Sequence, residues 1–517
     1  MTKVLKAGAL WLAITIIVWL ITIWRWQSDA HDASAGEIVG QLFVLPVLLT
    51  VFLLLVLWAV KRLRLQAAAP ILAAPESSAA APAVAMPAQT SSDEAQRGLS
   101  AWVLAEAVTL AAGNDAAGAW AGLRSHAVRP ELDSELQDVD GMPVFTSRVA
   151  DLDVCDWLDA HAELTQASHL SEPVLRGLAL LEGPLHQMLQ AVQAWPLSAL
   201  SSRAGPAAVE MAGGQSHPPM KAHLSGVAAP VNRAQAQARA AMAPQLTMRL
   251  LLPRHWSAAE RESAVDWVRS QCGALLDWAE AHQTTGLRWL TEPVERPECL
   301  WEEVDHQIVQ WSRNPRPELL LILAVDSAVN EPGVERMQAV GELFTSSHQT
   351  GKVPGEAAAG LLLANEHWPM SAEPDVPPVR MWRPVRATRD KSADAAGRVG
   401  AVELGAALQQ ALALNQADKD RLLVVSDADH RASRTAELFE ALQEVMPGAD
   451  PMLAVTRVGE SCGDIGLARA LVPSALACTA LRASGSSDLV AVATHVQSSH
   501  DRVVVALAPS GAAVATA

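Results

Sequence analysis

The stretch PELLLILAVDS, residues 317–327, is a nearly unbroken run of aliphatic side chains. A strand with one wet face alternates polar and apolar residues, whereas a strand covered on both faces shows a continuous apolar run. We therefore expect a buried strand here. A helix is expected at 331–345, and the sequence AAGLLLANE at 358–366 predicts a second strand of the same kind.

The same rhythm continues on both sides of this segment. Further strands are expected at 245–253, 421–429, 452–458, 488–494 and 502–508, and further helices at 257–280, 400–414, 431–446 and 466–483. Alternating strands and helices predict an α/β body, here with three layers and a mixed sheet. The stretches 245–370 and 400–510 have a similar order of elements, which indicates an internal duplication within a body that spans 243–517.

The segment before this body, residues 101–242, is expected to be α+β. An amphipathic helix is predicted at 101–112, a short strand at 141–149 and a helix at 173–195. Residues 202–242 are rich in Gly, Pro and Ala and show no clear period. We interpret them as a long loop or a boundary.

Two uncharged apolar runs lie near the N-terminus, at 7–24 and 42–60. As helices they are about 27–29 Å long, close to the ~30 Å hydrocarbon core of a bilayer. A transmembrane hairpin over residues 1–65 is therefore predicted. The alternative is a cleaved signal peptide at the first run, but this run is longer than a usual signal core, and the second run would still halt transfer.

The charges around the two runs predict their orientation. Basic residues flank the hairpin on its outer sides, at Lys3, Lys6, Lys61, Arg62 and Arg64, whereas the connecting loop has one, Arg25. Because Lys and Arg stay on the cytoplasmic side, both ends should face the cytoplasm. Residues 66–100 are rich in Ala, Pro and Ser and should form a flexible tether between the hairpin and the body.

Composition excludes several classes of function. The net charge is −17 and no dense basic patch occurs, which argues against a nucleic-acid partner. The chain has five cysteines at wide spacings and no C-x-x-C pair, which argues against a disulfide framework and a zinc site. The chain is not expected to be itself a lipase, although GESCG at 459–463 matches the G-x-S-x-G pattern of a nucleophile elbow. The glycines around Lys352 do not fit the spacing of a phosphate-binding loop.

Three segments of the C-terminal part resemble the thiolase-like fold of β-ketoacyl synthases. They are the stretch ELLLILAVDSA with VPGEAAAGLLL, the stretch RLLVVSDADHRASRTAEL, and the stretch GESCGDIGLARAL. The resemblance implies a thioester-dependent enzyme with a nucleophilic Cys at a helix N-terminus and two groups, usually His, that stabilise an oxyanion.

The sequence departs from that pattern where the chemistry would occur. His430 matches the first His position, but the second falls on Asp464, whose negative charge would oppose a developing oxyanion. Cys299, the nearest thiol before the apolar strand, lies among acidic residues that should raise its pKa. We therefore expect lost catalysis, with no catalytic, cofactor-binding or metal-binding residues and no cofactor.

The cytoplasmic portion as a whole resembles the type VI lipase adapter proteins. The stretches that carry this resemblance are RPELDSELQDVDGMPVFTSRVADLD, MWRPVRATRDKSADAAGRVGAVELGAAL, VVSDADHRASR and VGESCGDIGLARAL, scattered through 129–471. The resemblance implies a protein of the bacterial inner membrane that binds a lipase-type effector and delivers it to the spike of a type VI secretion system, in virulence or competition. The alternatives are a membrane-bound acyltransferase or β-ketoacyl-synthase-like enzyme, and a scaffold that binds no effector.

Two local clusters each have a simpler interpretation beside a functional one. Asp427, Asp429 and His430 could hold a divalent cation, but we prefer a turn in which one Asp caps the helix from Arg431. The basic residues of 379–391 could bind a carboxylate-rich partner, whereas the simpler interpretation is an exposed connecting segment. These basic residues are Arg380, Arg383, Arg386, Arg389 and Lys391.

Overall fold

The computed structural model describes Trp19 and residues 98–510, with gaps at 162–163, 165–169, 195–243, 282–286, 295, 371–375, 414–421 and 449. Apart from Trp19, the predicted spans at 7–24 and 42–60 lie outside the described residues, as do the segment 202–242 and nearly all of the tether. In the described part of the chain, no helix has both the length and the apolar character needed to cross a membrane. The chain divides into two compact units, Met1–Ala85 and Met86–Ala517, and residues 98–510 belong to the second.

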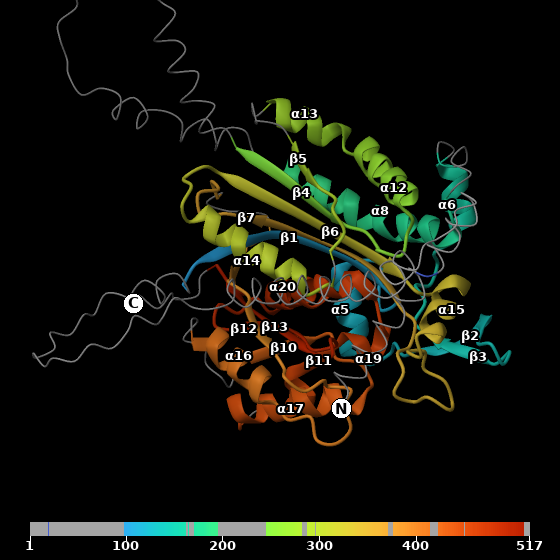
Figure 1. The fold of residues 1–517 in the computed structure, drawn as a ribbon. Coiled ribbons are helices and arrows are strands. Elements are labelled where there is room, and N and C mark those ends of the chain that lie inside the picture. Colours follow the sequence, from blue (N-terminus) through green and yellow to red (C-terminus); the bar gives the residue numbers. More distant parts are fainter. Residues whose placement is uncertain are drawn as a thin grey trace, which may run out of the picture. The chain divides into compact units, whose positions relative to one another are not determined.

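One 11-stranded mixed sheet runs through this second unit (Figure 1). Its first half contains β1 (Ser100–Leu110), β4 (Gln245–Leu251), β5 (Leu287–Leu290), β6 (Glu318–Ser327) and β7 (Glu356–Ala364). Its second half contains β8 (Val379–Trp382), β9 (Val385–Thr388), β10 (Leu422–Ser426), β11 (Val455–Arg457), β12 (Val490–His495) and β13 (Asp501–Pro509). Antiparallel pairing of β1 with β8 joins the halves.

The two halves repeat one topology. The first has the strand order β5-β4-β6-β7-β1, and the second has β11-β10-β12-β13-β8. The directions agree as well: in each half the first three strands of this order are parallel, and the last two pairs are antiparallel. The two halves thus share one order and direction of strands; the first includes β1, far upstream of residue 245, and the second includes β8, upstream of residue 400.

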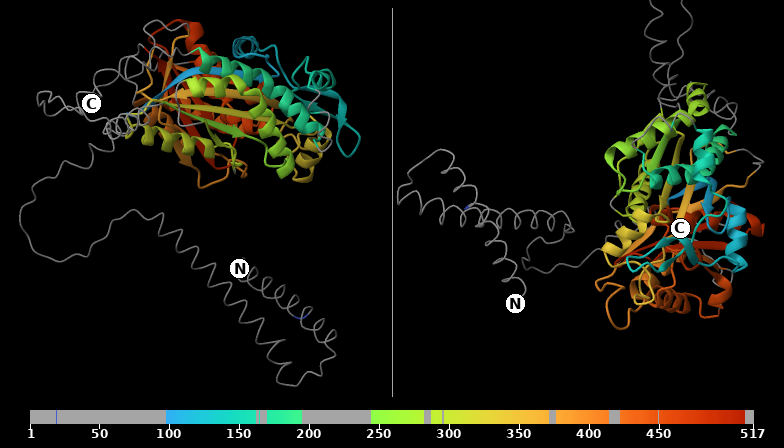
Figure 2. Two further views of the ribbon diagram at one scale, coloured as in Figure 1. Left: turned by 90° about the horizontal axis from the view of Figure 1, so that it is seen from above. Right: turned by 90° about the vertical axis from the view of Figure 1, so that its right-hand side faces the viewer.

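Helices cover both half-sheets and also lie between them (Figures 1 and 2). The outer face of the first half packs on α8 (Glu172–Gln193), α12 (Ala258–Gln271) and α13 (Gly273–Ala281). The outer face of the second packs on α16 (Val402–Ala413) and α17 (Ala432–Val445). Between the halves lie α14 (Cys299–Trp311) and α20 (Val472–Ser484), whose core includes side chains of both half-sheets. Each half therefore has three layers, which are its outer helices, its half-sheet and the middle helices. The two halves share the middle helices, so the three-layer prediction fits each half and not the whole body.

Shorter elements surround the sheet. They are α5 (Ala116–Arg124), α6 (Val154–Ala160), α15 (Glu331–Ala339), α18 (Pro451–Ala454), α19 (Val458–Cys462) and the 3-10 helix η3 (Gly466–Ala470). A separate two-stranded hairpin consists of β2 (Glu131–Gln137) and β3 (Pro143–Thr146). It lies beside α15 in Figure 1.

Most predicted elements of the body are present, and the errors have physical reasons. The helix predicted at 101–112 is wrong, because pairing with β7 and β8 makes β1 a central strand despite its Ala and Leu content. The helix predicted at 257–280 is two helices that meet at Cys272. The basic segment 379–391 is not simply an exposed connection: it forms β8 and β9, and much of it is buried.

Candidate functional site

The three segments that carry the ketosynthase resemblance contact one another, and we call this place the junction. The backbone N–H of Gly355 donates to the carbonyl of Asp464 at 3.2 Å, and the N–H of Asp464 donates to the carbonyl of Val353 at 2.8 Å. A Cβ on Gly459 would overlap the carbonyl oxygen of Asp427, so the segments at 426–431 and 459–466 are in contact too. The fold thus gathers these stretches into one place.

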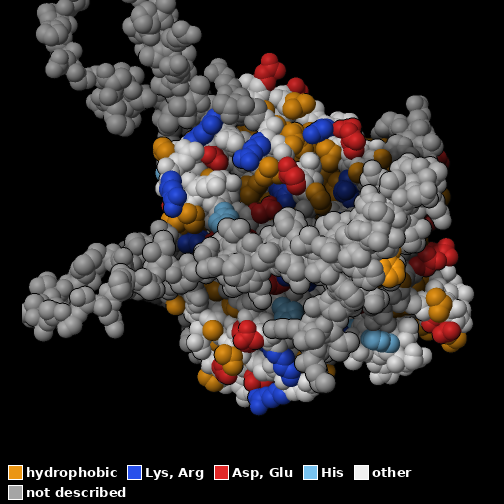
Figure 3. All heavy atoms as spheres, viewed as in Figure 1, with side chains coloured by type: hydrophobic (Ala, Val, Ile, Leu, Met, Phe, Trp, Pro, Cys, Tyr) orange, Lys and Arg blue, Asp and Glu red, His pale blue; other side chains and the backbone are white. Residues whose placement is uncertain are grey.

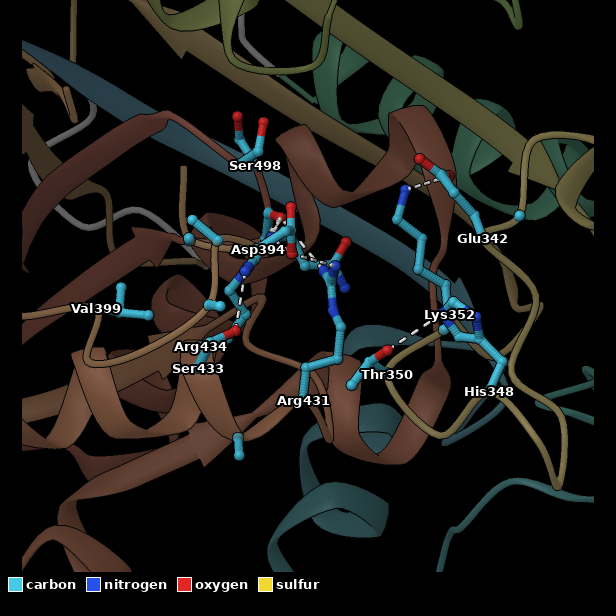
Figure 4. A pocket seen from close by; sticks show the side chains of 18 of the residues that line it. Glu342, His348, Thr350, Lys352, Asp394, Val399, Arg431, Ser433, Arg434 and Ser498 are labelled. Carbon is cyan, nitrogen blue, oxygen red and sulfur yellow. Dashed lines mark hydrogen bonds and ion pairs between the residues drawn. The ribbon is translucent and has the colours of Figure 1, made fainter. Parts of the chain in front are cut away.

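A cleft of about 680 Å³ opens beside this junction. The N-terminus of α17 forms one wall, and the loops around Lys352 and around Asp394 form the others. Figure 4 shows Arg431 and Arg434 reaching from this helix end toward Asp394, with Lys352 pointing to Glu342 on the other side. Almost every ionic group in the cleft therefore already has a partner.

Asp464 is the half-buried carboxylate at the position where the resemblance implies an oxyanion-stabilising group. Burial alone would raise its pKa, but the charges of Lys352 and Arg469 outweigh this effect and lower the pKa to about 2. The Lys352 ammonium lies 3.3 Å from the carboxylate. The charge of Asp464 in turn raises the pKa of Lys352. This place therefore holds a fixed negative charge.

Arg469 links the junction to the end of β10. Its guanidinium lies 2.9 Å from the Glu298 carboxylate and 3.4 Å from that of Asp427. Asp427 also accepts hydrogen bonds from the N–H groups of Val496 (2.6 Å) and Gln497 (3.2 Å). Burial raises the pKa of Asp427 to about 6, although the charge of Arg469 opposes this shift. Asp427 thus ties β10 to the end of β12.

Asp429 lies in the turn predicted for SDADHR but does not cap the helix, because the N-cap of α17 is Arg431, with no side-chain capping hydrogen bond. The Asp429 carboxylate accepts the N–H of Arg431 at 3.1 Å and pairs with that guanidinium at 2.8 Å, directly before α17. Asp427 faces Arg469 and the backbone after β12 instead. In the described ranges, no group of three or more His, Cys, Asp or Glu side chains is placed to hold a metal ion.

Two imidazoles near the junction lie in different surroundings. The ring of His430 packs edge-to-face on Phe344, with centroids 5.1 Å apart. His495 is the last residue of β12 and is 2% exposed. Burial, together with the charge of Arg469, lowers the pKa of His495 to about 3, so its ring is neutral.

The thiols differ in exposure. Burial raises the pKa of Cys272 and of Cys462 to about 12, and it raises the pKa of Cys478 as well. A thiol with such a pKa carries almost no thiolate at neutral pH. Cys299 is half-buried at the first residue of α14, and the side chain of Arg296 lies within its reach. Sequence analysis missed this helix position, because the Pro-rich stretch before Cys299 obscures where the helix begins.

The basic residues of 379–391 do not form one binding surface. Arg383 pairs with Asp305 at 2.6 Å, Arg386 with Glu302 at 3.0 Å, and the buried Arg389 with Glu437 at 2.6 Å. The Lys391 ammonium donates to backbone carbonyls of the loop at 396–398. These cations stabilise the fold around β8 and β9.

Glu356, the acidic residue of the VPGEAAAG segment, also has a structural role. It is fully buried and accepts two hydrogen bonds of 2.6 Å from Arg176 on α8. It further accepts the Ser327 hydroxyl and the Val149 N–H, each at 2.8 Å. One carboxylate thus connects β7, β6, α8 and the segment after β3.

No protein-family model matches the sequence, and the comparison with curated proteins gives no match. Among solved structures, the ishigamide ketosynthase/chain length factor is similar at a TM-score of 0.45 and 14% identity, covering 79% of this chain and 99% of that one. A type II PKS acyl-carrier protein in complex with its ketosynthase gives 0.47 and 10%, with the same coverages. An oxazolomycin ketosynthase domain of Streptomyces albus gives 0.43 and 12%, covering 80% and 76%. Likeness at this level assigns neither a family nor an activity to the chain.

Proposed function

We propose that this chain is a non-catalytic adapter on a thiolase-like body, which binds a lipase-type effector and delivers it to the spike of a type VI secretion system. The observation that carries the proposal is the ion-pair network at the junction. The position that would need a neutral or cationic oxyanion-stabilising group instead has the ionised Asp464, held by Lys352 and Arg469. A negative charge there opposes the developing charge of a thioester reaction.

The remaining groups support the same proposal. His430 is packed on an aromatic ring, and the buried thiols have raised pKa values. A large duplicated fold that does not carry out thioester chemistry can still offer its surface for binding other proteins. A membrane anchor at residues 1–65 with a tether at 66–100 is part of the proposal, because it would raise the local concentration of a bound effector near a membrane-embedded machine.

The second candidate is a membrane-bound acyltransferase or β-ketoacyl-synthase-like enzyme. It is favoured by one feature, the position of Cys299 at the first residue of α14 with Arg296 nearby. A third candidate is a scaffold that binds neither effector nor spike.

One experiment separates the three. The tagged full chain, purified in a mild detergent, is used to capture partners from a strain that carries a type VI system, and the bound proteins are identified by mass spectrometry. The adapter proposal expects a lipase-type effector and a spike protein, and recovery of neither contradicts it. Cys299→Ala and Cys462→Ala variants should secrete the effector as well as wild type, whereas loss of secretion with Cys299→Ala alone would favour the enzyme.

A further inference from the structure

Exposed large apolar side chains gather on the β2–β3 hairpin. Leu132, Val139, Met142 and Phe145 are 58%, 78%, 59% and 38% exposed, and Val340, next to α15, is 66% exposed. We call these five residues the hairpin patch. Leu132 and Phe145 are direct cross-strand partners, so they lie side by side on the same face. Contiguous exposed apolar residues of this kind mark interaction sites.

The hairpin patch is held in place from behind. The opposite face of the hairpin packs Leu136 and Val144 into a small core with side chains from α15 and the residues around it. The Val139 N–H donates to the Gln338 side chain at 3.1 Å. In the turn, the Asp138 carboxylate accepts the N–H groups of Asp140 and Met142, each at 2.9 Å. A preorganised surface loses little entropy on binding.

The hairpin carries charge of one sign, and Arg129 and Arg148 flank it in the sequence. Residues 131–146 contain no Lys or Arg, and their acidic members are Glu131, Asp133, Glu135, Asp138 and Asp140. Asp133 is buried and paired with Arg148, and Glu135 pairs with the same guanidinium at 3.4 Å. In the part of the chain that the structure describes, Glu131 and Asp140 enter no ion pair. Figure 3 shows apolar and acidic side chains next to each other at this edge of the molecule.

A groove of about 340 Å³ runs along β2, beside the hairpin patch. Its walls include Glu131, Leu132 and Ser134 on one side and Arg129 on the other, and Arg148 lines it as well. The groove gives an incoming side chain a concave place to insert, and the adjacent carboxylates can pair with a cation next to it.

We propose that the hairpin patch is the surface on which this protein captures its cargo, through a cationic, apolar-faced segment of the effector. The inference rests on the proposed function for the identity of that cargo. The sign of the charge argues against the other occupants. An anionic lipid surface and a nucleic acid would be repelled, and a second copy of this chain would bring the same acidic hairpin and a net charge of −17.

The test uses the full chain in detergent and two ligands. One is the effector recovered in the capture experiment, and the other is a synthetic peptide of alternating Lys and Leu, with a Glu/Leu peptide as its control. Val139→Ser with Met142→Ser should weaken both ligands roughly tenfold or more, because two apolar contacts are lost. Glu131→Lys with Asp140→Lys should weaken binding more at low salt than at high salt.

Matched control variants change residues of similar exposure elsewhere. Val402→Ser with Met452→Ser, which are 75% and 61% exposed, replaces the apolar pair, and Glu262→Lys with Asp277→Lys replaces the acidic pair. Both controls should bind as wild type does. A photo-reactive phenylalanine analogue at position 139 should cross-link to the effector, and the same analogue at position 402 should not.

The outcomes keep the two proposals apart. If wild type binds the effector and the hairpin variants bind it equally well, the surface is wrong and the adapter function stands. If wild type binds the Lys/Leu peptide but no effector, and the hairpin variants do not bind the peptide, the adapter function fails and the surface stands. Cross-linking from position 139 to a second copy of this chain, or equal cross-linking from both positions, would overturn the surface.

Discussion

The replacement Arg176→Met tests whether the motif residue Glu356 has a structural role. The side chain of Glu356 is fully buried, and Arg176 supplies two of its hydrogen bonds, both 2.6 Å. Methionine has similar length and no charge. After replacement, the carboxylate keeps only the Ser327 hydroxyl and the Val149 N–H as partners. Removing one partner of a buried ion pair costs about 3–5 kcal/mol, because an uncompensated charge stays inside the protein.

A double variant, Arg176→Met with Glu356→Gln, isolates the cost of that charge. Glutamine keeps a carbonyl acceptor for the Val149 N–H, and no buried charge remains. We expect the double variant to be less stable than wild type by only about 1–2 kcal/mol, and so more stable than the single variant. A double variant that is more stable than the single variant is diagnostic of an unpaired buried charge. Simple loss of packing would instead make the double variant less stable than the single one.

The assay is urea unfolding of the full chain in detergent, and near-UV circular dichroism is the signal that monitors it. Arg269→Met on α12 is the matched control, because its 3.2 Å pair with Asp266 is well exposed. Such pairs contribute about 0.2–1 kcal/mol at most. The reasoning is refuted if Arg176→Met costs no more than the control, or if the double variant is less stable than the single one.

Three further predictions concern contacts, protonation and thiol access. Gly355→Ala should destabilise the protein by about 1–3 kcal/mol, since the new Cβ would overlap the Cys462 carbonyl, whereas Gly273→Ala, which meets no atom within 4 Å, should be neutral or stabilising in the same urea assay. Burial raises the pKa of Asp326 to about 6 in the folded protein, so its contribution to stability is present below pH 4 and lost as the pH rises to about 6. The free energy of unfolding of Asp326→Asn, measured relative to wild type between pH 4 and 7, should therefore increase with pH, and a flat difference would contradict the assigned burial. Ellman's reagent should modify the exposed Cys155 rapidly and the half-buried Cys299 slowly. It should modify the buried Cys272, Cys462 and Cys478 only after unfolding. Equal reaction of all thiols in the folded chain would contradict their placement.

Local patterns in the sequence were sufficient to predict most elements of the body. The run at 317–327 is β6, whose odd-numbered residues 319–325 pack on the outer helices while its even-numbered residues 320–324 pack on the middle layer. Burial on both faces is the reason for the unbroken apolar run. The repeated order of elements likewise indicated the duplication, because each half independently encodes its own strands and helices.

Short and tertiary-dependent elements were not predictable in this way. The strands β8 and β9 and the residues next to them contain Arg383, Arg386 and Arg389, and the partners Asp305, Glu302 and Glu437 make those charges compatible with a sheet. The same holds for β1, whose helix-favouring composition is overridden by pairing on both edges. Such partners lie far away in sequence, so no local window contains them.

The candidate site shows the same division. From the sequence alone, Asp464 was recognisable as a carboxylate in an unfavourable position for thioester chemistry. Only the tertiary structure determined that Lys352 and Arg469 hold Asp464 ionised, and that Leu132, Val139, Met142 and Phe145 point outward. Composition and periodicity determine which helices and strands form, because these depend on neighbours in the chain. The ionisation and the exposure of a side chain depend on groups that the fold brings together from distant parts of the sequence.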